Sequence, residues 1–253
     1  MEAFAILLAA GKGTRMKSEL PKVLHPVGGV PMIGRLVGKL ETMPITRILA
    51  VIGHRGELVK KCLGTRVTYV QQEHQLGTAH AVHQTERLLS TRSGSTLVLT
   101  GDTPLIRQST IERLLAAQRA NISAGVVLTA IVQDPTGYGR IIRDSASGEV
   151  IDIIEEKDAT PEQKQINEIN TGIFCFDNES LFQALPGITN DNAQQEYYLT
   201  DIVKVMRWTG TSGGQKRFEA LILEDPTEVM GINTPEQLEE ANRAFYEHMG
   251  IFT

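Results

Sequence analysis

Cysteine and long apolar runs are both scarce in this sequence of 253 residues. Its two cysteines, Cys62 and Cys175, are too few for a disulfide framework and indicate a reducing compartment. The longest apolar run, residues 3–10, is too short to span a bilayer. Glu2 stands where a signal peptide carries positive charge, so a buried strand explains this run better. We therefore expect a cytoplasmic protein without membrane insertion.

An excess of positive charge is missing as well. The sequence has 25 Lys and Arg against 30 Asp and Glu, a formal net charge of -5, which argues against nucleic-acid binding. The balance is uneven along the chain, because residues 1–66 contain 11 basic and 4 acidic side chains. A basic stretch on an acidic body indicates a local site for an anionic ligand. The alternative is an ordinary solvated charged surface.

Regular alternation of expected strands and helices marks the first half of the chain. Continuous apolar runs indicate strands that are covered on both faces, and Ser109 is expected to cap a helix. Repeated strand–helix–strand units predict a mostly parallel sheet with right-handed crossovers. The expected strands are residues 4–9, 47–52, 67–70, 96–100 and 125–132, and the expected helices are residues 31–41, 57–63, 78–89 and 110–119.

The second half of the chain is less regular. Expected strands at 139–143, 149–155 and 172–176 indicate a smaller added sheet, and helices are expected at 196–207 and 235–248. The fold class is therefore α/β, with a mostly parallel central sheet and a smaller added sheet in the C-terminal half. Ligands of such sheets bind outside the carboxyl ends of the strands, so site residues are expected directly after strands.

A glycine-rich segment, LAAGKGTRM at residues 8–16, follows the first expected strand. The backbone N–H groups of such a turn can approach a phosphate, and Arg15 and Lys22 add positive charge. Met16 stands where the third glycine of a dinucleotide-binding fingerprint belongs, which excludes that motif. The alternative is a flexible glycine turn with solvated charges.

Asp102 follows the fourth expected strand, in the motif GDTPL. A carboxylate at this position can hold Mg²⁺ against ligand phosphates. The alternative is a turn aspartate that bonds its own backbone. Three later loops, residues 134–140, 155–158 and 167–172, place hydrogen-bonding groups beside glycines or strand ends. The hydroxyl and acetamido groups of a sugar require such partners, and the alternative is turn chemistry.

Polar residues 71–80 follow the third expected strand. Side-chain amides there can read the edge of a base, and the alternative is a polar loop with a threonine cap. His74, His80 and His83 invite a zinc interpretation. They lack a supporting thiolate or a metalloprotease motif, so ordinary histidines are favoured.

Taken in this order, the segments resemble the uridylyltransferase domain of the bifunctional N-acetylglucosamine-1-phosphate uridylyltransferase/glucosamine-1-phosphate acetyltransferase family. The resemblance runs from about residue 3 to the C-terminus. It implies a Rossmann-like nucleotide-diphospho-sugar transferase fold, with a domain at residues 1–230 and a closing helical segment at 231–253. The motifs that carry it are LAAGKGTRM, PKVLHP, QLGTAHA, GDTPL, DPTGYGRI, EEKDAT, EINTG and NDNAQQEYYLTD.

The resemblance implies Mg²⁺-dependent transfer of UMP from UTP to N-acetylglucosamine 1-phosphate. The products are UDP-N-acetylglucosamine, for cell-wall precursor synthesis, and pyrophosphate. The implied catalytic residues, of which the first two hold phosphates, are Arg15, Lys22 and Asp102. The implied Mg²⁺ ligands are Asp102 and Asn233. The uridine end is assigned to Leu8, Ala9, Ala10, Gly11, Gln72, Gly77 and Thr78. The nucleotide sugar is assigned to Thr100 and Gly101, and its N-acetylglucosamine to Gly139, Glu155 and Asn170.

The full-length family continues into a left-handed β-helix of hexapeptide repeats that carries the acetyltransferase. No such repeat occurs in these 253 residues, so acetyl transfer is not expected of them. We expect a trimer only where the β-helix is present, and otherwise a monomer. Two other functions stay open: a nucleotide-sugar-binding regulatory module without turnover, and a sugar nucleotidyltransferase that uses another sugar phosphate.

Overall fold

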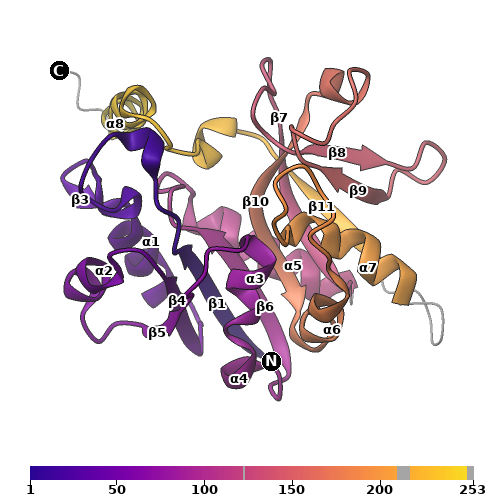
Figure 1. Ribbon diagram of the computed structural model, residues 1–253, viewed down its shortest axis with the longest axis horizontal. Coiled ribbons are helices and arrows are strands. Elements are labelled where there is room, and N and C mark those ends of the chain that lie inside the picture. Colours follow the sequence, from indigo (N-terminus) through magenta and orange to yellow (C-terminus); the bar gives the residue numbers. More distant parts are fainter. Residues whose placement is uncertain (122, 210–216, 250–253) are drawn as a thin grey trace.

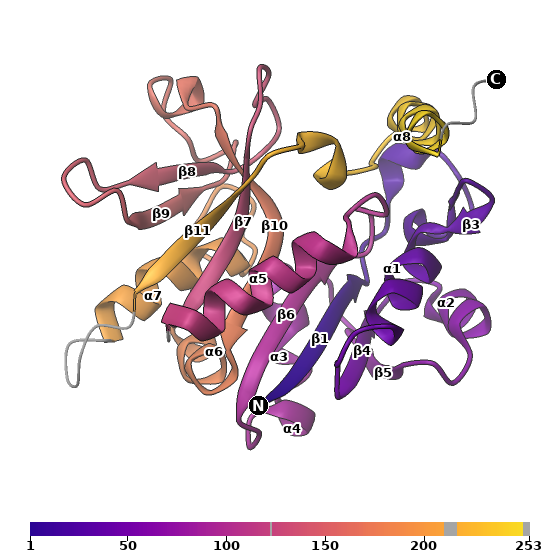
Figure 2. The same ribbon diagram turned by 180° about the vertical axis from the view of Figure 1, so that it is seen from behind.

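A central sheet organises the computed structural model, which describes residues 1–121, 123–209 and 217–249 (Figures 1 and 2). Its strands lie in the order β11-β7-β10-β6-β1-β4-β5. β10 is antiparallel to both neighbours, and the other adjacent pairs are parallel. The mostly parallel α/β sheet predicted from the sequence is confirmed. The bounds are β1 Glu2–Ala9, β4 Arg47–Ile52, β5 Thr68–Gln71, β6 Gly94–Thr100, β7 Gly125–Ile131, β10 Glu168–Asp177 and β11 Phe218–Leu223.

Helices cover both faces of this sheet because its central strands are apolar on both sides. In β1, Ala5 and Leu7 belong to one core, Phe4 and Ile6 belong to the other, and all four are buried. The helices around the first core are α1 Met32–Glu41, α2 Gly56–Leu63 and α5 Gln108–Asn121. Those around the second are α3 Thr78–His83, α4 Glu86–Leu89, α6 Asn178–Ala184 and α7 Ile202–Thr209.

The strand expected at 172–176 lies in the central sheet rather than in the added one. β10 begins earlier, at Glu168, and fits between β6 and β7 because its residues 173–176 are buried on both faces. The added strands of the second half are the hairpin β8 (Arg140–Arg143) and β9 (Val150–Ile154). This hairpin joins β10 through a single pair, Ile169 with Arg140.

Two expected helices begin or break differently. The helix expected at 78–89 is interrupted, because the buried Thr85 hydroxyl donates to the backbone oxygen of Val82 at 2.7 Å. The helix expected at 196–207 starts later: residues 199–201 form a 3-10 helix, and α7 follows. The described short 3-10 helices are η1 Thr14–Met16, η2 Lys22–Leu24, η3 Gln163–Gln165, η4 Leu185–Gly187, η5 Leu199–Asp201 and η7 Pro226–Val229.

The cap of α5 also differs from the prediction. Ser109 lies inside the helix, which begins at Gln108. A carboxylate oxygen of Glu228 instead accepts from the backbone N–H of Arg107 at 2.9 Å. The start of α5 is therefore capped by a side chain more than a hundred positions away, and not by Ser109 as the local sequence predicts.

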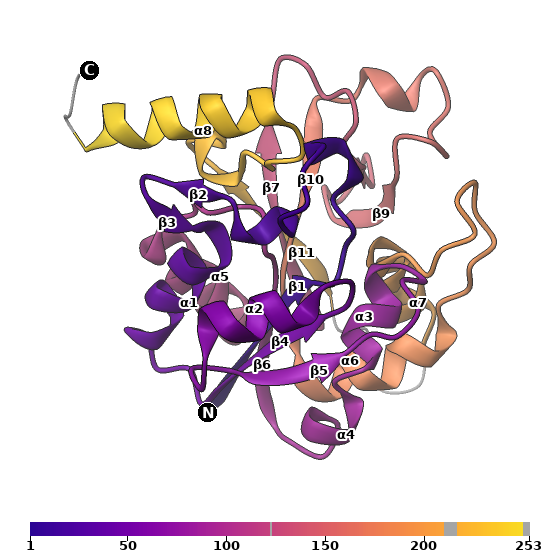
Figure 3. The same ribbon diagram turned by 60° about the vertical axis from the view of Figure 1, so that its left-hand side comes forward.

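The C-terminal helix returns to the first quarter of the chain. α8 (Pro235–His248) has the predicted bounds and lies beside a small antiparallel sheet of β2 (Pro26–Val27) and β3 (Val30–Pro31) (Figures 1 and 3). Asn242 of α8 accepts from the backbone N–H of Gly28 at 2.9 Å. Within the described ranges, no helix is both long enough and apolar enough to cross a bilayer.

Candidate active site

A cavity of about 530 Å³ opens at the carboxyl ends of β1, β5 and β6, where the sequence places its motifs. Its size is that of a small-molecule site. The predicted site residues that line it are Leu8, Ala9, Ala10, Gly11, Lys22, Gln72, Gly77, Thr78, Thr100 and Asp102. The edge rule for parallel sheets explains why residues from three separate motifs meet here.

The glycine-rich loop after β1 forms one wall of this cavity. Gly13 has a φ of 61°, and a Cβ at this position would lie 2.7 Å from Cβ of Lys22. Glycine is therefore required where the loop passes η2. A Cβ at Gly101 would similarly lie 2.9 Å from the backbone oxygen of Leu8, so the chain around Asp102 also packs closely against β1.

Lys22 brings the two predicted Mg²⁺ ligands together. Its Nζ donates to the carboxylate of Asp102 and, at 2.9 Å, to Oδ1 of Asn233. The backbone N–H of Ile232 donates to the backbone oxygen of Asp102 at 3.1 Å, which ties the two ligand-bearing segments together. The side chains of Lys22 and Asp102 are only 18% and 14% exposed, so a cation and an anion face each other at the edge of the cavity.

The donor set at Asp102 and Asn233 fits magnesium. It offers one carboxylate and one amide oxygen, and Mg²⁺ in phosphate-transfer sites commonly takes one or two carboxylates together with substrate phosphates. Within the described residues, no group of three or more His, Cys, Asp or Glu could hold a metal. His74, His80 and His83 therefore form no cluster of this kind in the part of the chain that the structure describes.

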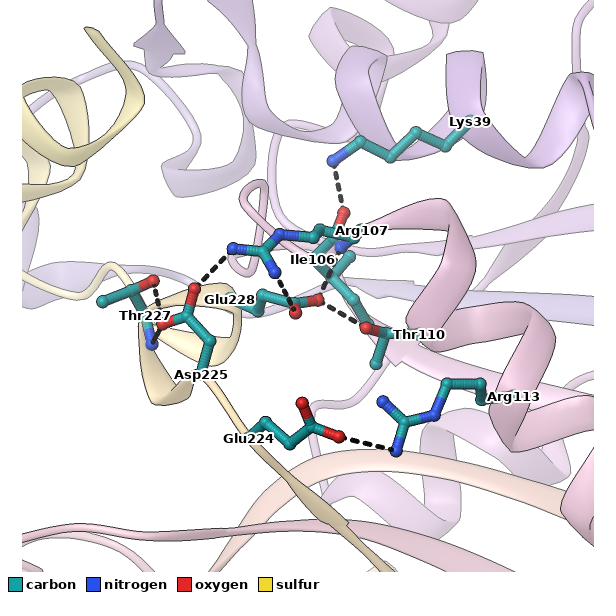
Figure 4. A network of polar contacts seen from close by, with 9 residues as sticks. All are labelled: Lys39, Ile106, Arg107, Thr110, Arg113, Glu224, Asp225, Thr227 and Glu228. Carbon is teal, nitrogen blue, oxygen red and sulfur yellow. Dashed lines mark hydrogen bonds and ion pairs between the residues drawn. The ribbon is translucent and has the colours of Figure 1, made fainter. Parts of the chain in front are cut away.

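A polar network holds the chain that follows Asp102 from two sides (Figure 4). Nζ of Lys39, on α1, donates to the backbone oxygen of Pro104 at 2.8 Å. Glu228, on η7 and 4% exposed, accepts from the Thr110 hydroxyl at 2.6 Å and pairs with Arg107. Because η7 leads to Asn233, the network links both candidate metal ligands to the core. Burial lowers the pKa of Lys39 to about 8.

The opposite end of the cavity is built around a buried amide. Gln72 is 3% exposed, and its Nε2 lies 3.2 Å from the backbone oxygen of Gly77. A Cβ on Gly77 would lie 2.4 Å from the backbone oxygen of Tyr197, and Gly77 has a φ of 116°. The Thr78 hydroxyl accepts from the backbone N–H of Leu199 at 2.9 Å, so it does not cap α3 as the simpler interpretation proposed.

Residues 197–199 connect the loop at residues 72–79 to the second half of the chain. Besides the Thr78 bond, the backbone N–H of Ala79 donates to the oxygen of Tyr197 at 2.9 Å. The backbone N–H of Tyr197 donates to the oxygen of Leu76 at 2.8 Å. These bonds explain the late start of α7, because an extended chain is needed to make them.

The three residues predicted for the sugar lie together. The backbone N–H of Asn170 donates to the oxygen of Gly139 at 2.8 Å, and a Cβ on Gly139 would lie 3.5 Å from Oε2 of Glu155. The Glu155 carboxylate accepts from the Thr200 hydroxyl at 3.1 Å. Burial raises the pKa of Glu155, and the surrounding acidic side chains shift it in the same direction.

A β-bulge brings this group close to Thr100, which lines the cavity. The pairing of β10 with β7 shifts register between Asn170 and Phe174. Within the bulge, Asn170 Oδ1 accepts from the backbone N–H of Gly172 at 2.9 Å. Gly172 has a φ of 76°, and a Cβ there would lie 3.1 Å from Cγ2 of Thr100, which lines the cavity.

The remaining predicted residue, Arg15, lies exposed on η1 and does not line the cavity. The sequence did not point to five residues that do line it, although all five belong to the motifs quoted above. Lys12 sits in the glycine-rich motif, Gln75 in QLGTAHA and Glu196 in the acidic and amide-rich motif before α7. The others are Val23 and Ala81.

Comparison with known proteins agrees with this arrangement. A family model for MobA-like NTP transferase domains matches residues 5–163. The bifunctional protein GlmU of Enterococcus faecalis is 47% identical over 246 residues, which cover 97% of this chain and 52% of that protein. GlmU of Brevibacillus brevis is 48% identical over 239 residues, covering 94% and 50%. The chain therefore spans about half the length of these curated relatives.

The structural comparison gives the same fold at lower identity. A crystal structure of UDP-glucose pyrophosphorylase complexed with UDP-glucose has a TM-score of 0.77 and 19% sequence identity, covering 98% of this chain and 100% of that chain. The family resemblance predicted from the sequence motifs is confirmed by these matches. This chain belongs to the family of MobA-like NTP transferase domains.

Proposed function

We propose that this chain transfers UMP from UTP to N-acetylglucosamine 1-phosphate, releasing pyrophosphate and forming UDP-N-acetylglucosamine for cell-wall precursor synthesis. The observation that carries the proposal is the order of groups along one sheet edge. Gln72 follows β5 at the edge of the sheet, and Asp102 follows β6, closer to its middle, with Lys22 beside it. Asn170, which we assign to the sugar, lies on β10, the strand next to the β6 strand that ends at Thr100. This order matches base, phosphates and sugar in the proposed product.

The chemistry needs positioning and charge neutralisation more than proton transfer. A phosphate oxygen of the sugar phosphate attacks the α-phosphorus of UTP, a new P–O bond forms, and the bond to the bridging oxygen of the leaving pyrophosphate breaks. The attacking phosphate is ionised at neutral pH, so no general base is required. Lys12 and Lys22 line the cavity and would neutralise charge on the phosphates.

Asp102 and Asn233 would hold Mg²⁺ together with substrate phosphate oxygens. The ion, when bound, would neutralise charge that develops on the transferring phosphoryl group. The role of this chain is to keep the two ligands on segments that are bonded to each other, through the backbone N–H of Ile232. Arg15 is exposed and does not line the cavity, so its contact with a phosphate stays a prediction.

Pyrophosphate release tests the proposal directly. UTP and N-acetylglucosamine 1-phosphate are supplied with Mg²⁺ and then with EDTA, and glucose 1-phosphate serves as the control acceptor. Release that requires both the metal and the acetamido group supports the proposed reaction. Release with glucose 1-phosphate but not with N-acetylglucosamine 1-phosphate would show that the acceptor is a different sugar phosphate. No release with either acceptor, together with measurable binding of UDP-N-acetylglucosamine, would favour the regulatory module.

A further inference from the structure

His80 contacts the amide that faces the base end of the cavity, although it does not line the cavity itself. Its Nδ1 lies 2.9 Å from Nε2 of Gln72. We propose that His80 is a positioning residue: it fixes the Gln72 amide so that the amide oxygen faces the bound base, which selects pyrimidines that carry an N3–H. This inference rests on the proposed function, and it assigns to His80 a part in the choice of nucleotide.

The orientation of the Gln72 amide follows from its neighbours. The backbone oxygen of Gly77 can only accept a hydrogen bond, so the amide atom 3.2 Å away must be the nitrogen. The same nitrogen also faces Nδ1 of His80, and an amide nitrogen can only donate. Nδ1 must therefore carry a lone pair, and the imidazole is neutral with its proton on Nε2.

The environment of His80 favours this neutral form. Burial lowers the pKa of His80, and the nearby His83 and His74 add to the shift. Gln84 places an amide nitrogen 3.2 Å from Nε2 of His80, which would suit the other tautomer. The Gln72 contact determines the tautomer of His80, because Gln72 is buried between two fixed partners. Gln84 is only half-buried, and its nitrogen keeps its bond to the backbone oxygen of His80 at 3.1 Å when Nε2 carries the proton.

With both amide hydrogens engaged, Gln72 has only its oxygen left for a ligand. Among the residues that the structure describes, no donor reaches this oxygen, and Gln72 lines the cavity. Uracil and thymine present an N–H at position 3, which would satisfy it. Cytosine presents a lone pair at the same position, so two acceptors would face each other. The contact therefore rejects cytidine nucleotides and does not separate UTP from TTP.

Three variants on one helix test this assignment. His80→Leu removes the acceptor, and His80→Asn can place its amide oxygen near the position of Nδ1. His83→Leu is the matched control, because His83 lies on the same helix and pairs with Glu86 at 3.2 Å instead. Binding of UTP, TTP and CTP is measured for each protein by titration calorimetry with Mg²⁺, and kcat/KM for the three nucleotides accompanies it.

The preference for UTP over CTP is expected to fall at least about fivefold in His80→Leu, with the change mainly in KM. It recovers in His80→Asn and is unchanged in His83→Leu. Nitrogen NMR of the wild-type histidines should show the Nε2–H tautomer for His80. An equal loss of UTP and CTP binding in His80→Leu, or a protonated Nδ1, would overturn the proposal. A wild-type protein without any preference between UTP and CTP would also overturn it, whereas a lack of pyrophosphate release with every sugar phosphate would count against the proposed function.

Discussion

Nζ of Lys22 donates to Oδ1 of Asn233 at 2.9 Å, although the two residues are 211 positions apart in the sequence. The same ammonium contacts the carboxylate of Asp102. A lysine cation therefore lies against both oxygens that we assign to Mg²⁺. The ammonium and the metal compete for the same partners, so Lys22 must leave them before it can hold a substrate phosphate.

Replacing Lys22 with Met is expected to move metal binding and catalysis in opposite directions. Without the competing cation, Mn²⁺ should bind more tightly in the absence of nucleotide, as measured by electron paramagnetic resonance. Turnover should suffer, because a charge-assisted phosphate contact is worth about 1.5–3 kcal/mol, or at least roughly tenfold in kcat/KM. The matched control is Lys17→Met, an exposed lysine of the same basic stretch. Weaker Mn²⁺ binding, or unchanged kcat/KM, would contradict the assignment.

Asp102→Asn keeps the shape of the side chain and removes its charge. Turnover should fall by at least about a hundredfold, because the metal supplies several kcal/mol of charge stabilisation. The Mg²⁺ concentration for half-maximal activity should rise. Nucleotide binding measured without metal should persist, since the base end at Gln72 is untouched. Full turnover in this variant would remove Asp102 from the metal site.

Glu155→Gln should affect the sugar phosphate more than UTP. The Glu155 carboxylate lies beside Asn170 and Gly139, in the group that we assign to the sugar. KM for N-acetylglucosamine 1-phosphate is expected to rise at least about fivefold, with little change in KM for UTP. Initial rates measured with each substrate varied in turn give the two KM values. Equal changes in both KM values would place Glu155 elsewhere.

The raised pKa of Glu155 also predicts a gain in stability for the same variant. In the folded protein this carboxyl keeps its proton to higher pH than in the unfolded chain, so its contribution to stability falls as pH rises through that interval. At neutral pH, Glu155→Gln should therefore unfold at a higher urea concentration than wild type. A lower urea midpoint would show that the buried Glu155 carboxylate does not destabilise the folded protein.

Lys39 gives a pH dependence of the opposite kind. Burial lowers its pKa from 10.5 to about 8, so between these values the unfolded chain binds more protons and stability rises with pH. The free energy of unfolding of wild type relative to Lys39→Met should grow by up to about 1.4 kcal/mol per pH unit in that interval. Urea titrations at pH 8 and 9.5 measure it. Lys60→Met, at an exposed lysine that pairs with Glu57, is the matched control.

Sequence patterns predicted the parts of the fold that depend on local hydrophobicity. The run at 4–9 and the spacing at 235–248 correspond closely to β1 and α8. Parallel strand ends then explain why Gln72 and Asp102, thirty positions apart, line one cavity. These hydrophobic patterns are local, so they can be read without knowing which distant residues come into contact.

The features that could not be predicted from the sequence depend on contacts between residues far apart in the chain. β10 was assigned to the added sheet because its insertion between β6 and β7 depends on partners distant in sequence. The cap of α5 by Glu228 has the same origin. His80 looked like an ordinary helix histidine, since its contact with Gln72 appears only once the loop at 72–77 has folded.

Residues 197–200 belong to both halves of the site at once. Tyr197 bonds the loop that we assign to the base, and Thr200 bonds Glu155, which we assign to the sugar. A substrate that shifts this stretch of four residues would change the affinity of the site for the other substrate. Thermodynamic reciprocity makes the two changes in binding free energy equal. The affinity for UTP should consequently depend on whether the sugar phosphate is bound, and the protein would take up its two substrates as a cooperative pair.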